Sequence, residues 1–378
     1  MQYRIVESIS DIDPDDWNRL QGTDNPFLRH EFLAALELSD SVSRATGWRP
    51  RHALALDDDH QLVAALPLYL KDNSYGEFVF DFSWANAYQQ AGLHYYPKLV
   101  AAVPFTPASG QRILVAEEQD YASCSDFMVR STIAYAKELN VSSLHVLFPE
   151  EDETTAIKKN GLLLRKDCQF HWHNRDYSSF DDFLQSFTSS KRKKTRRERK
   201  KIAEAGIRFE SRSGHDMSAE LWAEILPMYA RTFWQRGRPP YLNDAFFEQI
   251  SATLPDNLVV FIARQNSAAV ATAICFRSDT RLYGRYWGAS TFVDSLHFET
   301  CYYQGIEYCI EHGLDVFEPG TQGEHKISRG FVPAETWSAH WLSDSRFFSA
   351  VDNFLDQERQ HINNYMDLVR DHSPYRED

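Results

Sequence analysis

Hydrophobic and polar positions follow one order of elements in two blocks of the chain. In the first block, residues 52–73 alternate as expected for a strand, an Asp-rich turn and a second strand. Residues 120–140 then carry apolar side chains at helical spacing, and a strand-like run follows at 142–149. This block predicts a hairpin followed by a helix and a further strand.

The second block repeats that order with little identity of sequence. Residues 258–280 predict a strand, a polar turn and a strand, and residues 281–290 predict a third strand. Residues 295–313 predict a helix that stops at Gly313, and the strand after it covers residues 314–319. The repeat indicates two copies of one α/β unit, each with a mixed sheet.

The length and composition agree with two such units. The chain has 378 residues, of which 43% are hydrophobic and 25% charged, so it can bury a core in each of two domains. We therefore predict an α/β (α+β) fold with mixed β-sheets flanked by helices. The predicted domains are residues 1–177 and 178–378, the second of which carries a basic helix and the predicted active-site loop.

Positive charge is concentrated in that basic helix. Residues 191–201 hold nine basic residues and one acidic residue, whereas the whole chain has a net charge of −14. Ser189 or Ser190 is a plausible N-cap, and Gly206 a plausible C-terminal stop. Two interpretations stay open: a solvated linker helix, or an anion-binding surface beside a cleft.

Several classes of protein are disfavoured by the sequence. The acidic net charge argues against a general nucleic-acid coat protein, and the apolar runs are too short to span a bilayer. The N-terminus shows no signal-peptide pattern, and five cysteines without a CxxC motif favour reduced thiols in a cytoplasmic protein. His297 and Glu299 form an HxE motif, but no PCxxC follows, so neither a zinc deaminase nor another metal site is expected.

Residues 318–331, EPGTQGEHKISRGF, are the strongest candidate for chemistry. Breaks at Pro319 and the following glycines would let backbone amides approach a ligand, at the carboxyl end of a strand. Lys326 or Arg329 could stabilise an oxyanion. A proton from an attacking amine could go to one of three neighbours, which are Glu318, Glu324 and His325. The alternative is a loop held together by internal ion pairs.

The chain resembles the Fem-like group of bacterial proteins, predicted N-acyltransferases connected with peptidoglycan biosynthesis or recognition. The resemblance extends from end to end. It rests on SWANAYQQAGLHYYPKLVAAVPFTPASGQRIL in the first half, and on SSKRKKTRRERKK, LHFETCYYQGIEYCIEHGL and FEPGTQGEHKISRGF in the second. It implies two tandem GNAT-like domains and a distant relationship to the Fem transferases, which attach amino acids from aminoacyl-tRNA to cell-wall precursors.

The resemblance also implies a site residue. In Fem transferases a lysine followed shortly by Gly-Phe is associated with the reacting acyl group, and HKISRGF places Lys326 there, with slightly different spacing. The segment RYWGAS, residues 285–290, departs from the acetyl-CoA loop of GNAT domains, because Ser290 stands where Gly or Ala is expected. No tightly bound cofactor is therefore expected, and the acyl donor stays open between acyl-CoA and aminoacyl-tRNA.

Aromatic residues of the first half form a second candidate group. A groove between the two predicted domains could be lined by Asp81, Trp84, Tyr95, Tyr96 and Lys98, or these residues could form a packed aromatic support layer. Pro104 and Pro107 would interrupt a central strand, so the surrounding segment is predicted to be a sheet edge or to line a cleft.

Together these arguments give one leading function and one alternative. The leading function is transfer of an acyl or aminoacyl group to an amine, and the alternative is a non-catalytic protein that binds a peptidoglycan precursor or another anionic ligand. A tRNA, a nucleotide-linked precursor or an anionic membrane face is a candidate partner of the basic helix. The candidate catalytic residues are Lys326, Glu318, His325 and Glu324, and the candidate substrate-binding residues are Arg329, Arg285, Tyr286, His297, Glu299, Lys191, Arg192, Lys194, Arg196, Arg197, Trp84, Tyr95, Tyr96 and Lys98.

Overall fold

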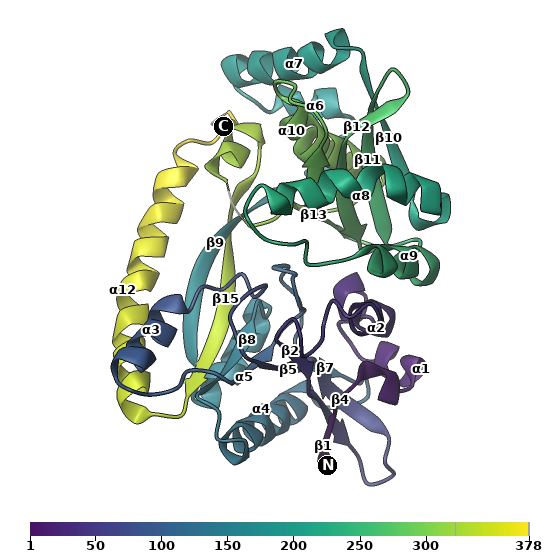
Figure 1. The fold of residues 1–378 in the computed structure, drawn as a ribbon. Helices are drawn as coiled ribbons and strands as arrows, with labels where there is room; N and C mark the ends of the chain where they lie inside the picture. The colour runs from purple at the N-terminus through teal and green to yellow at the C-terminus, as the bar shows by residue number, and fades with distance from the viewer. Residues whose placement is uncertain (322, 377–378) are drawn as a thin grey trace. The chain divides into compact units, whose positions relative to one another are not determined.

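This computed structural model describes residues 1–321 and 323–376 (Figure 1). The chain divides into two compact units. Unit 1 comprises Met1–Cys168 and Glu335–Asn364, and unit 2 comprises Gln169–Ala334 and the C-terminal segment from Tyr365. The predicted division after residue 177 differs from these units, because unit 2 begins at Gln169 and Glu335–Asn364 returns to unit 1. A pattern of local periodicity carries no information on such a return.

Unit 1 contains two groups of paired strands. The first is antiparallel and has the order β1-β3-β4-β7, with bounds Gln2–Val6, His52–Leu56, Leu62–Leu66 and Leu114–Val115. The second has the order β2-β5-β6-β8-β15, with bounds Trp48–Pro50, Leu68–Lys71, Lys98–Ala101, Ser143–Leu147 and Val332–Leu342. In it β6 and β8 are parallel, whereas β5–β6 and β8–β15 are antiparallel.

Helices cover the strands of unit 1. They are α1 (Pro14–Asn18), α2 (His30–Leu38), α3 (Phe82–Gln90), α4 (Tyr121–Glu138), α5 (Glu151–Lys159) and α12 (Ser345–Arg370). The apolar face of α4, which includes Met128 and Ile133, packs against strand residues such as Leu66 and Leu99 in the main core of this unit. A smaller cluster joins α3 to α12 through Trp84, Tyr88 and Leu355.

Unit 2 has one mixed sheet. Its order is β10-β11-β12-β13-β14-β9, with bounds Ile207–Ser213, Leu258–Gln265, Ala268–Arg277, Arg281–Ala289, Val316–Glu318 and Leu163–His173. Its helices are α6 (Phe180–Gln185), α7 (Ser189–Glu204), α8 (Ala219–Trp234), α9 (Asp244–Thr253), α10 (Leu296–Phe298) and α11 (Gln304–Glu311), with a π-helical turn η4 (Glu299–Tyr303) between the last two. Helix α8 packs against β12 and β13 (Figure 1).

The local predictions from the sequence agree with these elements. The α/β class is confirmed, and the two hairpins predicted at residues 52–73 and 258–280 are β3–β4 and β11–β12. The basic helix is α7, and Gly206 follows it in the left-handed conformation (φ 70°). Its N-cap, however, is Thr188 rather than either predicted serine, and no side-chain hydrogen bond caps it.

One of two alternatives for a strand position is not met. The segment around Pro104 and Pro107 was expected at a sheet edge or lining a cleft, and the strand that precedes the prolines, β6, lies between β5 and β8 rather than at an edge. The strand ends at Ala101, so both prolines follow it and interrupt none of its hydrogen bonds. None of the helices in the described residues combines the length and the apolar character needed to cross a bilayer.

The close packing of α8 on β13 gives a test of the fold of unit 2. A Cβ added at Gly288 would lie 2.2 Å from the backbone carbonyl of Met228 in α8. Gly288→Ala must therefore push the helix from the sheet and should lower the free energy of unfolding by about 1–3 kcal/mol, measured by chemical denaturation. Unchanged stability would mean that α8 is not seated on β13 at this distance.

Candidate functional site

The candidate site of unit 2 begins where two parallel strands stop pairing. Strands β13 and β14 pair over only three residues, from Arg281↔Val316 to Tyr283↔Glu318. Strand β14 then ends at Glu318, whereas β13 continues to Ala289. The segment after Glu318 therefore leaves the sheet at the carboxyl end of β14, beside the middle of β13. Open α/β sheets bind ligands at the carboxyl ends of their strands.

Lys326 is the most unusual ionisable group of this segment. It lies in the short helix η5 (Glu324–Arg329), is 1% exposed, and its Nζ donates a hydrogen bond of 2.5 Å to the carbonyl of Gly320. Burial lowers the pKa of Lys326 to about 7, and the Cys301 thiol acts in the opposite direction. At neutral pH a large fraction of this lysine is therefore an uncharged amine, which can accept a proton.

Glu318 is an ion-paired carboxylate rather than a free base. It is 3% exposed, and its Oε1 accepts a hydrogen bond of 2.9 Å from Nη1 of Arg281. Its Oε2 lies 3.9 Å from Nε2 of His171. Burial, together with the charge of Arg281, lowers the pKa of His171 to about 3, so this ring is neutral. Arg281 and His171 were not predicted from the sequence as neighbours of Glu318, because they lie in other strands, β13 and β9.

The π-helical turn η4 contributes a second group that was missed. Such turns are rare and often occur at functional sites. Here the turn places Cys301 beside Lys326, and burial raises the pKa of that thiol well above its usual value. Tyr302 of the same turn forms a hydrogen bond of 2.8 Å with Nε2 of His325. A lone cysteine in an apolar helix gives no sign of this contact in the sequence.

The remaining catalytic candidates lie on the outer side of η5. His325 is exposed, although its ring contacts Phe298 and Tyr302, and burial with the nearby Arg329 and Lys326 charges lowers the pKa of the ring. Glu324 is exposed and accepts a hydrogen bond of 3.0 Å from Tyr365. Of the four catalytic candidates, Lys326 and Glu318 are thus buried, and the other two face outward.

Arg329 belongs to a buried ion pair. Its Nη2 lies 3.0 Å and 3.1 Å from the two carboxylate oxygens of Glu198 in α7, and its guanidinium lies 3.3 Å from the centroid of Phe298. Tyr303 donates a hydrogen bond of 2.5 Å to the same carboxylate. These contacts give Arg329 a structural role, since they fasten η5, and with it Lys326, to the basic helix.

Three further candidates have packing contacts in unit 2. Tyr286 is 9% exposed and packs against Tyr229 and Phe247, and burial raises its pKa. The guanidinium of Arg285 lies 5.4 Å from the Tyr286 ring. His297 packs edge-on against Trp287 and Tyr302, and burial lowers its pKa to about 4.

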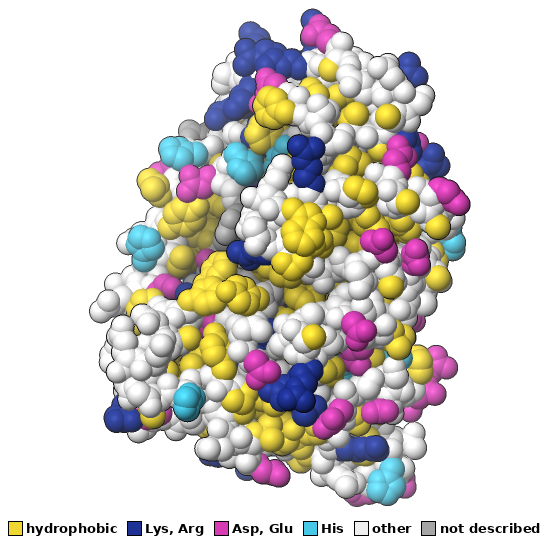
Figure 2. Space-filling view, in the orientation of Figure 1, with side chains coloured by type: hydrophobic (Ala, Val, Ile, Leu, Met, Phe, Trp, Pro, Cys, Tyr) yellow, Lys and Arg dark blue, Asp and Glu magenta, His cyan; other side chains and the backbone are white. Residues whose placement is uncertain are grey.

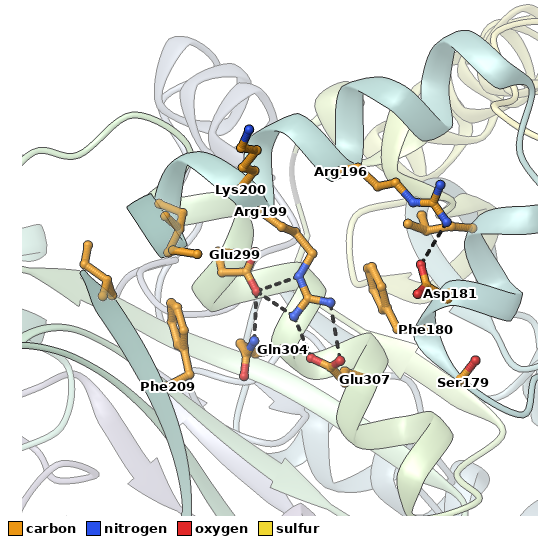
Figure 3. Close-up of a pocket in the computed structure, with 14 residues that line it drawn as sticks. Ser179, Phe180, Asp181, Arg196, Arg199, Lys200, Phe209, Glu299, Gln304 and Glu307 are labelled. Atoms are coloured by element: carbon orange, nitrogen blue, oxygen red, sulfur yellow. Dashed lines mark hydrogen bonds and ion pairs between the residues drawn. The ribbon is translucent and has the colours of Figure 1, made fainter. Parts of the chain in front are cut away.

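Two other candidates, Arg196 and Glu299, line a pocket of about 740 Å³ beneath α7 (Figure 3). Arg199 crosses it and pairs with Glu299 at 3.1 Å and with Glu307 at 2.7 Å. Arg196 at the rim pairs with the exposed Asp181 at 3.0 Å. The charges that line the pocket are therefore largely compensated by one another.

Five cations between Lys191 and Arg197 of α7 lack that compensation within the part of the chain that the structure describes. Figure 2 shows Lys and Arg side chains gathered over this helix. Among the described residues, no acidic group lies within ion-pair distance of five of them, which are Lys191, Arg192, Lys193, Lys194 and Arg197. Cations at a helix N-terminus oppose the helix dipole, so the cluster does not stabilise α7 itself.

The candidates of the first half all belong to unit 1. Lys98 is fully buried, and its Nζ donates to Asp81 at 2.5 Å and to Glu77 at 2.7 Å. Trp84 and Tyr95 are also buried, at 5% and 3% exposure. Tyr95 and Tyr96 line a pocket of unit 1, which is described below.

Comparison with known proteins identifies relatives of the chain. The model of the FemAB-like family, described as peptidoglycan biosynthesis/recognition, matches residues 8–377. A search of curated proteins gives no match.

Solved structures share the fold at low identity. The C-terminal domain of a proposed lysylphosphatidylglycerol synthetase from Agrobacterium fabrum is 10% identical, with a TM-score of 0.55, and the match covers 90% of this chain and 96% of that one. L-PGS from Bacillus licheniformis is 11% identical with a TM-score of 0.52, over 83% and 92% of the two chains. FemX is 12% identical with a TM-score of 0.51, over 93% and 100%. The predicted resemblance and fold class are thereby confirmed.

The Glu198–Arg329 pair predicts a large and specific effect on stability. Glu198→Ala leaves a buried, uncompensated guanidinium and should lower the free energy of unfolding by about 3–5 kcal/mol. Asp181→Ala is the matched control, because it breaks the exposed pair with Arg196 and should cost at most about 1 kcal/mol. The double variant Glu198→Leu/Arg329→Met should regain much of the loss in thermal denaturation. Equal effects of the two single substitutions would contradict the structural role of the buried pair.

Proposed function

Since the chain belongs to the FemAB-like family, we propose that unit 2 is an acyl- or aminoacyltransferase that modifies an amine on a cell-wall precursor. The observation that supports this most is Lys326. It is a buried lysine with a pKa of about 7, on the segment that leaves the sheet at the carboxyl end of β14. Perturbed ionisable groups of this kind concentrate at functional sites.

The chemistry assigned to Lys326 is proton transfer. The acceptor amine attacks the carbonyl carbon of the donor ester and forms a C–N bond, while its proton passes to the neutral Lys326 amine. The tetrahedral intermediate then collapses, the C–O bond to the donor breaks, and the lysine returns the proton to the leaving oxygen. Substrate binding has to replace the hydrogen bond between Lys326 and Gly320.

The charged neighbours then have supporting roles. Glu318 is held by Arg281, and this pair can orient a bound amine or ammonium group at the end of β14. Arg329 holds η5 in place through Glu198. The proposal therefore moves the proton acceptor from Glu318, Glu324 or His325 to Lys326.

The surface of α7 favours a polyanionic donor, aminoacyl-tRNA, over acyl-CoA. Residues 290–295, which connect β13 to α10, contain no glycine and do not form the glycine-rich turn typical of a pyrophosphate site. The five uncompensated cations of α7, by contrast, suit several phosphates of an extended backbone.

The first prediction concerns the dependence on pH. The rate of transfer should rise with pH through about 7 as Lys326 loses its proton, and then level off. Lys326→Met and Lys326→Arg should both lose about 100-fold or more in kcat/KM, because neither can accept a proton at neutral pH. The assay is the mass change of amine acceptors incubated with charged tRNA or acyl-CoA. Wild-type turnover in Lys326→Met would contradict the role of Lys326 as proton acceptor. If none of the donors gave a product, the protein would be a binding protein rather than a transferase.

A stability measurement tests the pKa without a substrate. The unfolded chain keeps the Lys326 proton up to its usual pKa of 10.5, whereas the folded protein releases it near 7. Between these values the unfolded state binds more protons, so the unfolding free energy should rise with pH in wild type relative to Lys326→Met. Parallel curves for the two proteins would show that the pKa is not lowered.

The third prediction of this subsection concerns α7. Lys194 and Arg197 are exposed, and their spacing places them on one face of the helix. The double substitution to Glu should weaken binding of charged tRNA and reduce the slope of log K against log salt by about 1.4–1.8. The matched control, Lys158→Glu/Lys159→Glu in α5, changes the net charge equally and should leave both quantities unchanged. The same loss in both variants would indicate only a net-charge effect.

A further inference from the structure

Unit 1 contains a pocket of about 630 Å³ that the proposed transfer chemistry does not use. One wall is the exposed side of α3, with Phe82, Asn86 and Gln89, and the other is the segment Gly92–Tyr96. Its volume lies within the range of pockets that bind small molecules. No Lys, Arg, Asp or Glu lines it, so nothing in the lining compensates a charged ligand.

The polar groups of this pocket are available to a ligand. Asn86, Gln89 and His94 are exposed, and no side-chain hydrogen bond engages any of them within residues 1–321 and 323–376. Each amide offers donors and an acceptor in one plane. Such groups suit a ligand that carries hydroxyls, since each hydroxyl both donates and accepts.

Exposed aromatic rings extend one side of the pocket. Phe82 is 47% exposed. The ring of Phe80 stacks with that of Phe82, with 6.2 Å between the ring centroids and 26° between the ring planes. The centroid of the Tyr75 ring lies 6.1 Å from that of Phe82. Phe80 and Tyr75 are themselves 56% and 59% exposed. A cluster of large apolar rings in water is unfavourable for a free surface and marks a contact site.

A buried polar network holds the back wall in place. Tyr95 donates its hydroxyl to Asp81 at 2.6 Å, and the hydroxyl of Tyr96 bonds Ser74 at 2.8 Å. Lys98 bonds both Asp81 and Ser74 and joins the two tyrosines into one network. The two rings are therefore oriented before any ligand arrives, which lowers the entropic cost of binding.

We infer that this pocket is a binding site for a neutral saccharide. A pyranose ring has an apolar C–H face that can stack on an aromatic ring such as Phe82, and equatorial hydroxyls that can pair with the amides of Asn86 and Gln89. A purely apolar ligand would bury those amides without partners, at a cost. A charged ligand would find no opposite charge in the lining.

Saturation-transfer NMR and calorimetry on the full chain test this inference. The probes are N-acetylglucosamine and glucose, which share the pyranose ring and differ in the acetamido group. Binding of either probe at millimolar concentration supports the site. A preference between the two probes shows whether the site recognises an acetamido group. Phe82→Ala and Asn86→Ala should each weaken binding by about tenfold. Neither is expected to unfold unit 1, because both side chains are exposed.

Two control variants make the outcome specific. Phe354→Ala removes a ring of similar exposure, 45%, from α12 outside the pocket and should leave the affinity unchanged. Lys326→Ala should also leave it unchanged, so a failure of the transfer chemistry does not affect the result. The inference is overturned if neither saccharide shows saturation transfer at millimolar concentration. Wild-type affinity in both pocket variants, or an equal loss in Phe354→Ala, would overturn it as well.

Discussion

The buried ion pair between Glu198 and Arg329 is the interaction on which the candidate site of unit 2 depends. It joins the basic helix α7 to η5, the short helix that carries Lys326. Tyr303 donates to the same carboxylate and adds the π-helical turn η4 to this connection. Because a buried charge is costly without its partner, the three elements form one cooperative cluster. The position of Lys326 is therefore decided by contacts that no single element makes alone.

Two buried lysines show how the surroundings decide the chemistry of one residue type. Burial by itself lowers the pKa of a lysine, and in Lys326 only the Cys301 thiol opposes this, so its pKa falls to about 7. In Lys98 burial acts in the same direction, but the carboxylates of Glu77 and Asp81 raise the pKa above its usual value. Lys98 is thus a permanent cation that holds a network together. Lys326 is an amine that can exchange a proton.

The cations of α7 also divide into those that acidic side chains pair with and those that have no acidic partner among the described residues. The C-terminal half of the helix is bound to its own unit, through Arg199 with Glu299 and Glu307 and through Lys201 with Asp294. Near the N-terminus lie four cations that no acidic residue of the described chain compensates, in a region where the helix dipole disfavours them: Lys191, Arg192, Lys193 and Lys194. The helix is therefore anchored at one end and presents charge to solvent at the other.

The sequence by itself determined the local elements and the family. Hairpins such as 258–280 and the helix of residues 120–140 follow from periodicity, which depends on neighbours along the chain, and the segment around Lys326 was found from its composition. Tertiary structure alone decided which groups meet. Arg281 and His171 reach Glu318 from other strands, Cys301 reaches Lys326 through a π-helical turn, and Glu335–Asn364 returns to unit 1. These contacts join residues distant in sequence, and both burial and pKa depend on such contacts, so no local pattern could have predicted them.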